Sequence, residues 1–412
     1  MRNLFKIAIR NLIRYKRRTL LTASLITIGV VFVLVFVSIS GSFKAMITGQ
    51  ITDSMMGHLQ FHSKGYVASI DNLPLNLNMK QTAYQKIAQK LRSNKHVETF
   101  SPRLKFGGMF SNFTETTNIR LNGIDPEAEF KTAPLFSSRI MEGKPTLARG
   151  EILIPALLAK GMKVKPGDPV VVVATNADGS VNGKQFIVSG ILESATGPGG
   201  RDGYVHIEDA AEVLRMTEME VSEVAVRLKD FSQLAAVVRQ LKGTVMDEVN
   251  EQGQPIFEVH SWEDLSPFFN IARMIDVMTF FIRIMLIAIV LISIMNVMIM
   301  AVYERIREIG TIAAIGTLPG KIRSMFIIEG FCMGVVGAII GVLIGILIIG
   351  IVNLIGISFD FGQQKGLLLT AKLSFFDLLF VPVIVIVVAV AASLQPAIKA
   401  SKMEPIEALR HV

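Results

Sequence analysis

Four long stretches without a charged residue constrain this chain more than any other feature. They cover residues 20–40, 284–302, 330–356 and 378–394. A helix of about 17 to 25 apolar residues, rising ~1.5 Å per residue, crosses the ~30 Å hydrocarbon core of a bilayer. The mean hydropathy of +0.49 is also high for a soluble protein. We therefore predict an α-helical membrane protein with four transmembrane helices. The first span is too long for a signal peptide and has no A-x-A site after it, so we expect it to be retained.

The distribution of charge predicts the orientation. The net charge of +8 divides into +7 on residues 1–19, −2 on residues 43–276 and +3 on the remainder. Short segments rich in Lys and Arg stay in the cytoplasm. The basic segments 1–19, 303–325 and 395–412 all fall on one side of four crossings, so both termini are expected there. The basic excess thus lies at the membrane, and a nucleic-acid partner is not expected.

The segment between the first two spans is predicted to be a large α/β domain over residues 57–262. A helix at 82–93 is flanked by strands at 57–63 and 97–104, and the same order recurs at 223–228, 231–241 and 256–260. Strands at 170–175 and 184–188, joined by NADGSVNG, predict a hairpin. We therefore divide the domain into an α/β part, 57–120 and 221–262, and a β-rich insert, 121–220, in which GPGGRDG at 197–203 is expected to be a mobile loop. The one cysteine, Cys332, falls in the third span, so no disulfide supports this domain.

Two helices are predicted to extend beyond the membrane. An apolar stripe continues past the first span at Phe43, Met46, Ile47, Ile51 and Met55. Pro267 suits the first turn of a helix and Ser266 suits its cap, so one helix over 267–302 would be ~54 Å long at ~1.5 Å per residue. We expect residues 20–56 and 263–302 each to form a transmembrane helix together with a stalk, the part of the same helix that extends outside the bilayer. In the alternative, each span ends at the interface, with Trp262 and Arg283 as anchors. The remaining segments are a basic amphipathic helix at 1–19, a third span at 326–356, a short outer loop at 357–372 and a fourth span at 373–394.

The stretch YERIREIGTIAAIG, residues 303–316, predicts a short amphipathic helix in the loop 303–325. Glu304, Arg305 and Glu308 lie on one side at steps of three and four residues, and an apolar edge lies opposite. Gly316 and the following Pro-Gly end the helix. Such a helix lies along the membrane surface, where it rests either in membrane lipid or in a groove of another protein.

The remaining patterns indicate helix packing or lack a feature that a metal, phosphate or catalytic site requires. Overlapping small-xxx-small spacing in the third span predicts helix packing, within the chain or across a dimer, at Gly330, Gly334, Gly337, Gly341 and Gly345. His58 and His62 lie in an alternating segment, which separates them by ~13 Å at ~3.3 Å per residue, so no metal site is expected. GTLPGKI at 316–322 lacks the spacing and the Ser or Thr of a phosphate-binding loop. No catalytic motif is present, so we expect neither an enzyme nor a bound cofactor.

Three segments together resemble one family. They are RRTLLTASLITIGV at 17–30, REIGTIAAIG at 307–316 and ASKMEPIEALRHV at 400–412. With the topology of one span, a large outer domain and three more spans, they are similar to the MacB/FtsX-like ABC permeases, which include the LolC/LolE lipoprotein-release permeases. The segment GYVHIEDAAEVLR at 203–215 resembles the lipoprotein-release branch.

This resemblance implies a location and a partner. The chain is expected in a bacterial inner membrane with its large domain in the periplasm. The stretch after the second span would be the coupling helix, which docks in a cleft of a cytoplasmic ABC ATPase dimer that binds ATP and Mg²⁺. Because the chain has no fused ATPase, a separate subunit is implied. We carry the coupling role onto Glu304, Arg305, Arg307, Glu308, Ile309, Gly310, Ala314 and Gly316, and onto Glu407, Leu409 and Arg410 in the tail. The Ile and Gly positions would bury against the ATPase.

Three functions remain open from the sequence. The last three spans have no ionisable residue in their central stretches, where Ser293 and Asn296 are the notable polar groups, so no polar cargo is expected to cross. The favoured function is a transporter subunit for a lipoprotein or another amphipathic substrate, paired with a second copy or a homologous permease and served by periplasmic partners. The alternatives are an FtsX-like regulator of a cell-wall hydrolase and an ATP-independent sensor, for which the 23-residue loop leaves no room.

Overall fold

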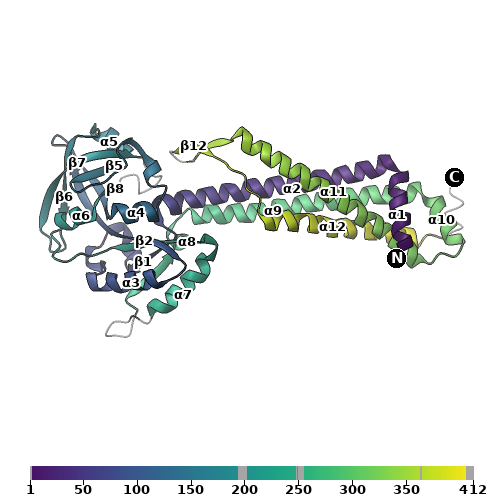
Figure 1. The fold of residues 1–412 in the computed structure, drawn as a ribbon, viewed down its shortest axis with the longest axis horizontal. Helices are drawn as coiled ribbons and strands as arrows, with labels where there is room; N and C mark the ends of the chain where they lie inside the picture. The colour runs from purple at the N-terminus through teal and green to yellow at the C-terminus, as the bar shows by residue number, and fades with distance from the viewer. Residues whose placement is uncertain (1, 194–201, 247, 249–254, 362–363, 405–412) are drawn as a thin grey trace. The chain divides into compact units, whose positions relative to one another are not determined.

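The computed structural model describes all residues except 1, 194–201, 247, 249–254, 362–363 and 405–412. Two compact units are distinguished (Figure 1). The helical unit comprises Met1–Ala45, Ala272–Ser358 and Leu368–Val412, and the sheet unit comprises Met46–Ile271 and Phe359–Leu367. Each is described by itself.

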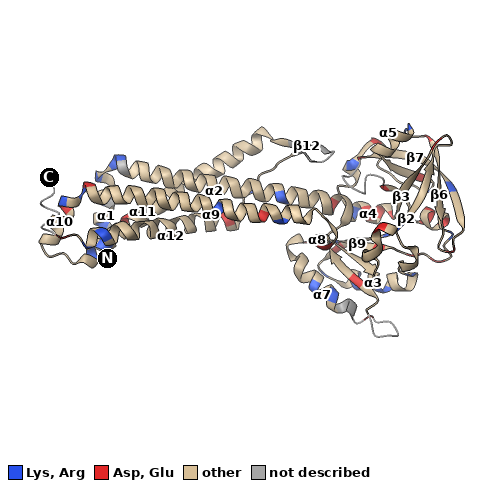
Figure 2. Ribbon diagram, turned by 180° about the vertical axis from the view of Figure 1, so that it is seen from behind, with Lys and Arg blue, Asp and Glu red and all other residues tan. Residues whose placement is uncertain are grey.

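The helical unit contains the four predicted spans. Its helices are α1 (Arg2–Arg14), α2 (Lys16–Ile51), α9 (Phe269–Glu304), α10 (Ile306–Ala314), α11 (Pro319–Ile355) and α12 (Phe375–Ser401). Within the described residues, α2, α9, α11 and α12 are long and apolar enough to cross a membrane. Figure 2 shows Lys and Arg concentrated on α1 and the start of α2. The predicted number and order of spans are therefore confirmed.

Two of these helices are much longer than a span. Both α2 and α9 have 36 residues, against the roughly 20 that a bilayer requires. In the helical unit, Lys44 Nζ on α2 lies 2.5 Å from Asp276 Oδ2 on α9. Both helices are thus longer than a span requires, and the division of each into stalk and span stays a prediction. At its start, α9 begins two residues after Pro267, and Ser266 Oγ accepts a hydrogen bond from the Phe268 amide.

The glycines of the third span lie where helices approach closely. A Cβ placed on Gly337 would lie 2.6 Å from Ile26 Cγ2, and one on Gly341 would lie 2.6 Å from Val30 Cβ, so both face α2. Gly345 also faces α2, at Leu34, whereas Gly330 and Gly334 face Ser393 and Ala389 of α12. The stripe thus packs α11 against two helices of the same chain.

The sheet unit is built on one mixed sheet. Its strands are β1 (Leu59–Ser63), β2 (Val97–Ser111), β3 (Thr116–Ile124), β4 (Ile140–Gly143), β5 (Glu151–Pro155), β6 (Pro169–Thr175), β7 (Val181–Leu192), β8 (Asp202–His206), β9 (Glu223–Leu228) and β10 (Phe257–Ser261). The order is β10-β1-β9-β2-β3-β8-β5-β7-β4, and β6 pairs with β2 and β7. The predicted hairpin is β6–β7, with Thr175 opposite Val181.

The boundary predicted between the α/β part and the insert does not separate two sheets. The 15-residue strand β2 pairs with β9 of the α/β part and with β3 and β6, and β3 itself crosses residue 121. A hydrophobic core that includes Phe106, Phe110 and Phe186 lies against these strands. Because β2 pairs with strands of both parts, it joins the two parts in one sheet.

Short helices complete the sheet unit. They are α3 (Gln81–Ser93), α4 (Pro126–Thr132), α5 (Ala156–Met162), α6 (Ile207–Val213), α7 (Leu234–Met246) and α8 (Trp262–Leu265), with 3-10 turns at Val67–Asn72, Leu75–Leu77, Ser137–Arg139 and Phe231–Gln233. Of the predicted loop 197–203, residues 197–201 lie outside the described residues, and Asp202 and Gly203 belong to β8. The predicted outer loop 357–372 contains β11 (Ser358–Phe361) and β12 (Gln364–Leu368).

Candidate coupling site

The predicted coupling helix is a separate short helix between two spans. Arg305, with φ −111° and ψ 19°, breaks the helix after α9, and α10 then runs from Ile306 to Ala314. Gly316 adopts φ +91°, which a residue with a side chain rarely takes, and this reverses the chain toward α11. The GTLPGKI stretch is thus the turn before α11 and its first residues, not a loop between a strand and a helix.

The two sides of α10 differ sharply in exposure. Ile309 is 2% exposed, Gly310 is buried, and Ile309 packs in one cluster with Val302, Ile322 and Phe326. These two positions are covered by the chain's own helices, so the expectation that they bury against an ATPase is wrong. Side chains on the outer side are exposed, at Arg307, Thr311, Ala314, Ile315 and Leu318.

Arg305 points inward rather than toward a partner. Its residue is 4% exposed. Its Nε lies 3.1 Å from Glu308 Oε2, and its Nη1 lies 3.4 Å from Glu329 Oε2 on α11. The guanidinium also lies 5.3 Å from the ring centroid of Tyr15 and 5.9 Å from that of Phe326, within range of a cation–π contact. Arg305 thus attaches α10 to α11 and to the α1–α2 junction.

Glu308 completes this attachment. It accepts a hydrogen bond of 2.9 Å from the Tyr15 hydroxyl. Burial favours the neutral form of Glu308, but the hydrogen bonds from Tyr15 and Arg305 outweigh it and hold the pKa of Glu308 below its ordinary value. The same hydrogen bond to Glu308 raises the pKa of Tyr15. We call Tyr15, Arg305, Glu308 and Glu329 the Arg305 cluster. Two of its members, Tyr15 and Glu329, were not among the residues predicted to couple to the ATPase.

A signal for one of the two missed residues was present in the sequence. Glu329 is a lone carboxylate within IIEGF, next to the third apolar run, and a carboxylate in such a position normally has a partner. Nothing in the pattern around Tyr15 indicates its contact, which spans 293 positions. The exposed candidates Glu304, Arg307, Ala314 and Gly316 keep their coupling role as a prediction. Glu407, Leu409 and Arg410 lie outside the described residues.

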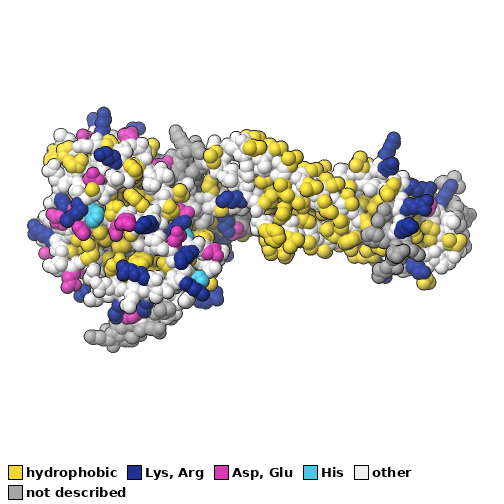
Figure 3. All heavy atoms as spheres, viewed as in Figure 1, with side chains coloured by type: hydrophobic (Ala, Val, Ile, Leu, Met, Phe, Trp, Pro, Cys, Tyr) yellow, Lys and Arg dark blue, Asp and Glu magenta, His cyan; other side chains and the backbone are white. Residues whose placement is uncertain are grey.

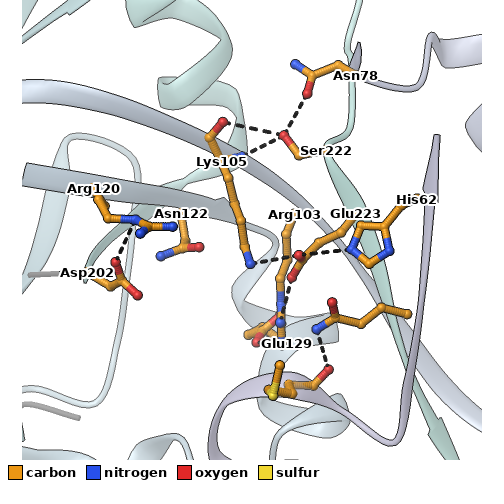
Figure 4. A network of polar contacts seen from close by, with 12 residues as sticks. His62, Asn78, Arg103, Lys105, Arg120, Asn122, Glu129, Asp202, Ser222 and Glu223 are labelled. Atoms are coloured by element: carbon orange, nitrogen blue, oxygen red, sulfur yellow. Dashed lines mark hydrogen bonds and ion pairs between the residues drawn. The ribbon is translucent and has the colours of Figure 1, made fainter. Parts of the chain in front are cut away.

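A second buried group of charges lies in the sheet unit (Figure 4). Arg103 on β2 stands opposite Glu223 on β9, and Glu223 stands opposite His62 on β1. Arg103 bonds Glu129 of α4 at 2.6 Å and Glu223 at 3.0 Å, while Lys105 Nζ lies 2.7 Å from Glu223. All of these carboxylates are buried. The group therefore ties three strands and α4 together.

His58 and His62, which have a spacing that metal ligands also show, contact other groups of the sheet unit. His62 Nε2 lies 3.6 Å from Glu223 Oε2, which is too long for a hydrogen bond and makes the contact electrostatic. His58 Nδ1 accepts a hydrogen bond of 3.0 Å from the Leu228 amide. The described residues contain no group of three or more His, Cys, Asp or Glu side chains with metal-binding geometry.

The end of α2 is fixed within the sheet unit. A π-helical turn, Thr52–Met56, follows α2, and Asp53 Oδ1 lies 2.5 Å from Arg227 Nη1 of β9. Arg139 donates to the Ser54 carbonyl at 3.1 Å, and the Leu135 amide donates to the Asp53 carbonyl at 2.9 Å. Burial opposes ionisation of Asp53, but His58 and Arg227 outweigh it and lower the pKa of Asp53. Four hydrogen-bonding groups thus hold this turn on the sheet.

Comparison with known proteins agrees with this architecture. Residues 19–244, more than half of the chain, match the MacB-like periplasmic core domain, and residues 280–405 match the FtsX-like permease C-terminal region. The chain is 23% identical over 412 residues to the lipoprotein-releasing system transmembrane protein LolC of Neisseria meningitidis, covering 95% of this chain and 94% of that protein. It is 24% identical over 422 residues to the ABC transporter permease YknZ of Bacillus subtilis, covering 98% of each.

A solved structure is also similar in part. The periplasmic region of MacB from Actinobacillus actinomycetemcomitans aligns with 54% of this chain and 94% of its own length, at 12% identity and a TM-score of 0.35. Two family models in the expected order, over four spans and one α/β outer domain, identify the family. The chain belongs to the family defined by the MacB-like periplasmic core domain, as an ABC transporter permease of the MacB, FtsX and LolC type.

Proposed function

We propose that this permease transmits movement, driven by ATP hydrolysis in a separate cytoplasmic ATPase dimer, to the sheet unit on the other side of the membrane. The chain itself performs no chemistry, and ATP and Mg²⁺ are held by the ATPase. Both termini and α10 lie in the cytoplasm, and two permeases, identical or homologous, form one complex in a bacterial inner membrane.

The observation that carries this proposal is the two-sided character of α10. Its inner side is tied to α11 and to the α1–α2 junction by the Arg305 cluster, with Arg305 buried. Its outer side presents Arg307 and Ala314, followed by Ile315 at 78% and Leu318 at 65% exposure. A partner that binds the outer side and moves therefore also moves the helices bonded to the inner side, because the buried Arg305–Glu329 pair resists separation.

The path toward the sheet unit is a continuous pair of helices. Both α2 and α9 contribute residues to the helical unit and to the sheet unit. In the helical unit Lys44 and Asp276 pair them, and in the sheet unit Asp53 and Arg227 fix the turn that follows α2. Each unit thus has its own attachment to α2, and movement passes along α2 and α9 in this proposal.

The substrate that we propose is a lipid-anchored protein handled at or outside the outer leaflet. The apolar runs 284–302, 330–356 and 378–394 of the last three spans have no charged residue, so a polar route through them is not supported. Similarity to LolC, which is named for lipoprotein release, supports this class. On the sheet unit Met109 is 49% and Phe113 is 63% exposed, and both lie in the β2–β3 hairpin region. Such exposed apolar groups suit contact with an amphipathic substrate.

The test of ATPase coupling is a bulky substitution on the outer side of α10. The chain would be co-expressed with the ATPases encoded by neighbouring genes and purified in detergent. Ala314→Trp is expected to lower ATPase recovery at least tenfold, because it places an indole where the partner would pack. Ile13→Trp places the same indole at an exposed position of α1 and is expected to retain the ATPase. Gly310→Trp is a poor choice, because Gly310 is buried inside the chain.

The outcomes separate the parts of the proposal. Full recovery with Ala314→Trp would reject α10 as the docking element. Failure of the unaltered chain to retain any neighbouring ATPase would reject the function as a whole. For the substrate, a photo-crosslinking residue at Phe113 is expected to capture lipoprotein in cells, whereas one at the exposed Glu115 is not. Capture at neither position would reject the lipoprotein assignment at this hairpin.

A further inference from the structure

An apolar pocket of about 310 Å³ lies in the helical unit where α1, α10 and α11 meet. The described residues that line it include Ile7, Ile309, Ile312, Ile322 and Met325, and Lys321 is the charged one among them. Ile309 and Ile322 are buried, whereas Ile7 of α1 is 47% exposed. Figure 3 shows Lys and Arg gathered at this end of the helical unit, beside the hydrophobic surface of the spans. The pocket therefore offers an occupant an apolar interior and one positive charge.

The positive charge of the pocket is available to a carboxylate. Lys321 is exposed in the first turn of α11, and within the described part of the chain no ion pair involves it. By contrast, Arg14 and Arg305 at the same end of the unit both lie near Glu308. An occupant with an apolar side chain and an adjacent carboxylate would therefore suit both the interior and the rim.

The described part of the chain ends close to this pocket. Lys399 Nζ, near the end of α12, lies 4.9 Å from the ring centroid of Tyr303, which precedes α10. Met403 packs against the buried cluster to which Ile309, Ile322 and Met325 belong. The eight residues 405–412 that follow can extend up to ~28 Å at ~3.5 Å per residue. The nine residues of α10 span only ~14 Å at ~1.5 Å per residue, so this tail is long enough to reach the pocket.

The sequence of the tail, PIEALRHV, complements the pocket. Ile406 and Leu409 are three residues apart, so a helical turn would place both on one side. Pro405 suits the first turn of such a helix. Glu407 follows Ile406 directly, which would bring its carboxylate to the edge of the apolar pair, where Lys321 is available.

We propose that residues 405–412 dock in this pocket of their own chain. Ile406 and Leu409 enter the apolar interior, and the Glu407 carboxylate pairs with Lys321 at the rim. A segment tethered by a few residues has a local concentration in the millimolar range, which favours it over an occupant from solution. The docked tail connects α12 to α1 and α10.

The docking places tail residues on the inner side of α10. The resemblance to the permease family implies that Glu407 and Leu409 contact the ATPase, and it implied the same for Ile309 and Gly310, which the chain's own helices cover. Glu407 and Leu409 then belong to the same inner side. Because only residues of this chain form the contact, the docking does not depend on the ATPase.

Disulfide formation in membranes tests the docking. The full-length chain carries Cys332→Ser, which removes its one native cysteine. The pair Ile312→Cys, Leu409→Cys is expected to form about fivefold more intramolecular disulfide than the pair Ala314→Cys, Leu409→Cys, measured as thiols protected from a polyethylene glycol maleimide. Ala314 is exposed on the outer side of the same helix and does not line the pocket. Equal yields in the two pairs, or a higher yield with Ala314→Cys, would overturn the docking.

Charge reversal tests the ion pair within the Ile312→Cys, Leu409→Cys chain. Lys321→Glu is expected to lower the disulfide yield about threefold, because it brings two carboxylates together, and adding Glu407→Lys is expected to restore it. The matched control, Arg323→Glu, reverses an exposed cation of α11 that does not line the pocket and should keep the yield. No recovery in the double reversal, or an equal loss with Arg323→Glu, would overturn the contact between Glu407 and Lys321.

The same disulfide separates this docking from contact with the ATPase. Its yield is expected to be equal in the chain expressed alone and in the chain co-expressed with the ATPases encoded by neighbouring genes. Linkage of Ile312→Cys to an ATPase in place of Leu409→Cys would assign the pocket to the partner and overturn the docking. Because the chain expressed alone carries the test, failure to retain an ATPase would reject the proposed function without changing this result.

Discussion

Arg305 Nη1 lies 3.4 Å from Glu329 Oε2, and the two side chains are 3% and 0% exposed. This pair connects the residue that precedes α10 to the first third of α11. Through this pair α10, a short helix in a loop, is bonded to the third span. One side of α10 therefore attaches to the chain's own helices, and the other side is exposed.

The first prediction concerns this pair. Glu329→Leu is expected to lower the stability of the helical unit by about 3 kcal/mol, because it leaves the buried Arg305 without one of its two carboxylates. The double variant Arg305→Met, Glu329→Leu is expected to recover much of the loss. Thermal unfolding in detergent measures both, with Glu304→Gln as an exposed control. Equal destabilisation by the single and the double variant would contradict the pairing.

The second prediction separates attachment from docking. Tyr15→Phe removes the hydrogen bond to Glu308, which is worth about 1.5–3 kcal/mol when one partner is charged. We expect ATPase binding to be kept while substrate-dependent stimulation of ATP hydrolysis falls, because the attachment of α10 to the α1–α2 junction is then reduced to the contact between Arg305 and the aromatic ring. Tyr303→Phe, which removes the hydroxyl that contacts Lys399, is the matched control. Normal stimulation in Tyr15→Phe would remove Tyr15 from the coupling path.

The third prediction compares two glycines of α11. Gly341→Ala places a Cβ 2.6 Å from Val30 Cβ, whereas the same change at Gly350 meets no atom within 4 Å. Overpacking costs about 1–3 kcal/mol, and alanine in a helix gains up to ~1 kcal/mol over glycine. Gly341→Ala should therefore lower the thermal midpoint, and Gly350→Ala should keep or raise it. The reverse order would show that α11 does not pack on α2 in the membrane.

The fourth prediction is a pH dependence of the sheet unit. Burial raises the pKa of Glu223, but Lys105 and Arg103 outweigh it and hold that pKa well below the ordinary 4.5. Because the folded pKa is the lower one, the stability from Glu223 is complete above the unfolded pKa and disappears as pH falls through the folded value. Glu223→Gln should cost about 3 kcal/mol at pH 7 and progressively less in acid.

Trp262 provides the measurement for that prediction. It is 3% exposed and lies in the sheet unit, so its fluorescence reports unfolding of this unit in urea. Glu115→Gln removes an exposed carboxylate of the same unit and should leave the pH dependence unchanged. The same acid dependence in Glu223→Gln and in the unaltered chain would exclude Glu223 as its source.

Properties that are local along the chain were determined by the sequence alone. The length of each apolar run, the position of its flanking Lys and Arg, and the three- and four-residue steps after Tyr303 specify spans, order and a loop helix, because a helix satisfies its own backbone hydrogen bonds. The strands of the α/β part were predicted from an equally local pattern, because successive side chains of a strand point to opposite faces and apolar and polar residues therefore alternate.

Only the tertiary structure decided which side of each element faces inward. It turned Arg305 toward Glu329 and Tyr15, buried Ile309 and Gly310, aligned His62, Glu223 and Arg103 across three strands, and joined the insert to the α/β part through β2. These pairings depend on helix rotation and strand register between segments far apart in the chain. The sequence pattern within one segment specifies neither the rotation of a helix against its neighbour nor the register between strands. The sequence therefore shows which residues are charged but not which residues they pair with.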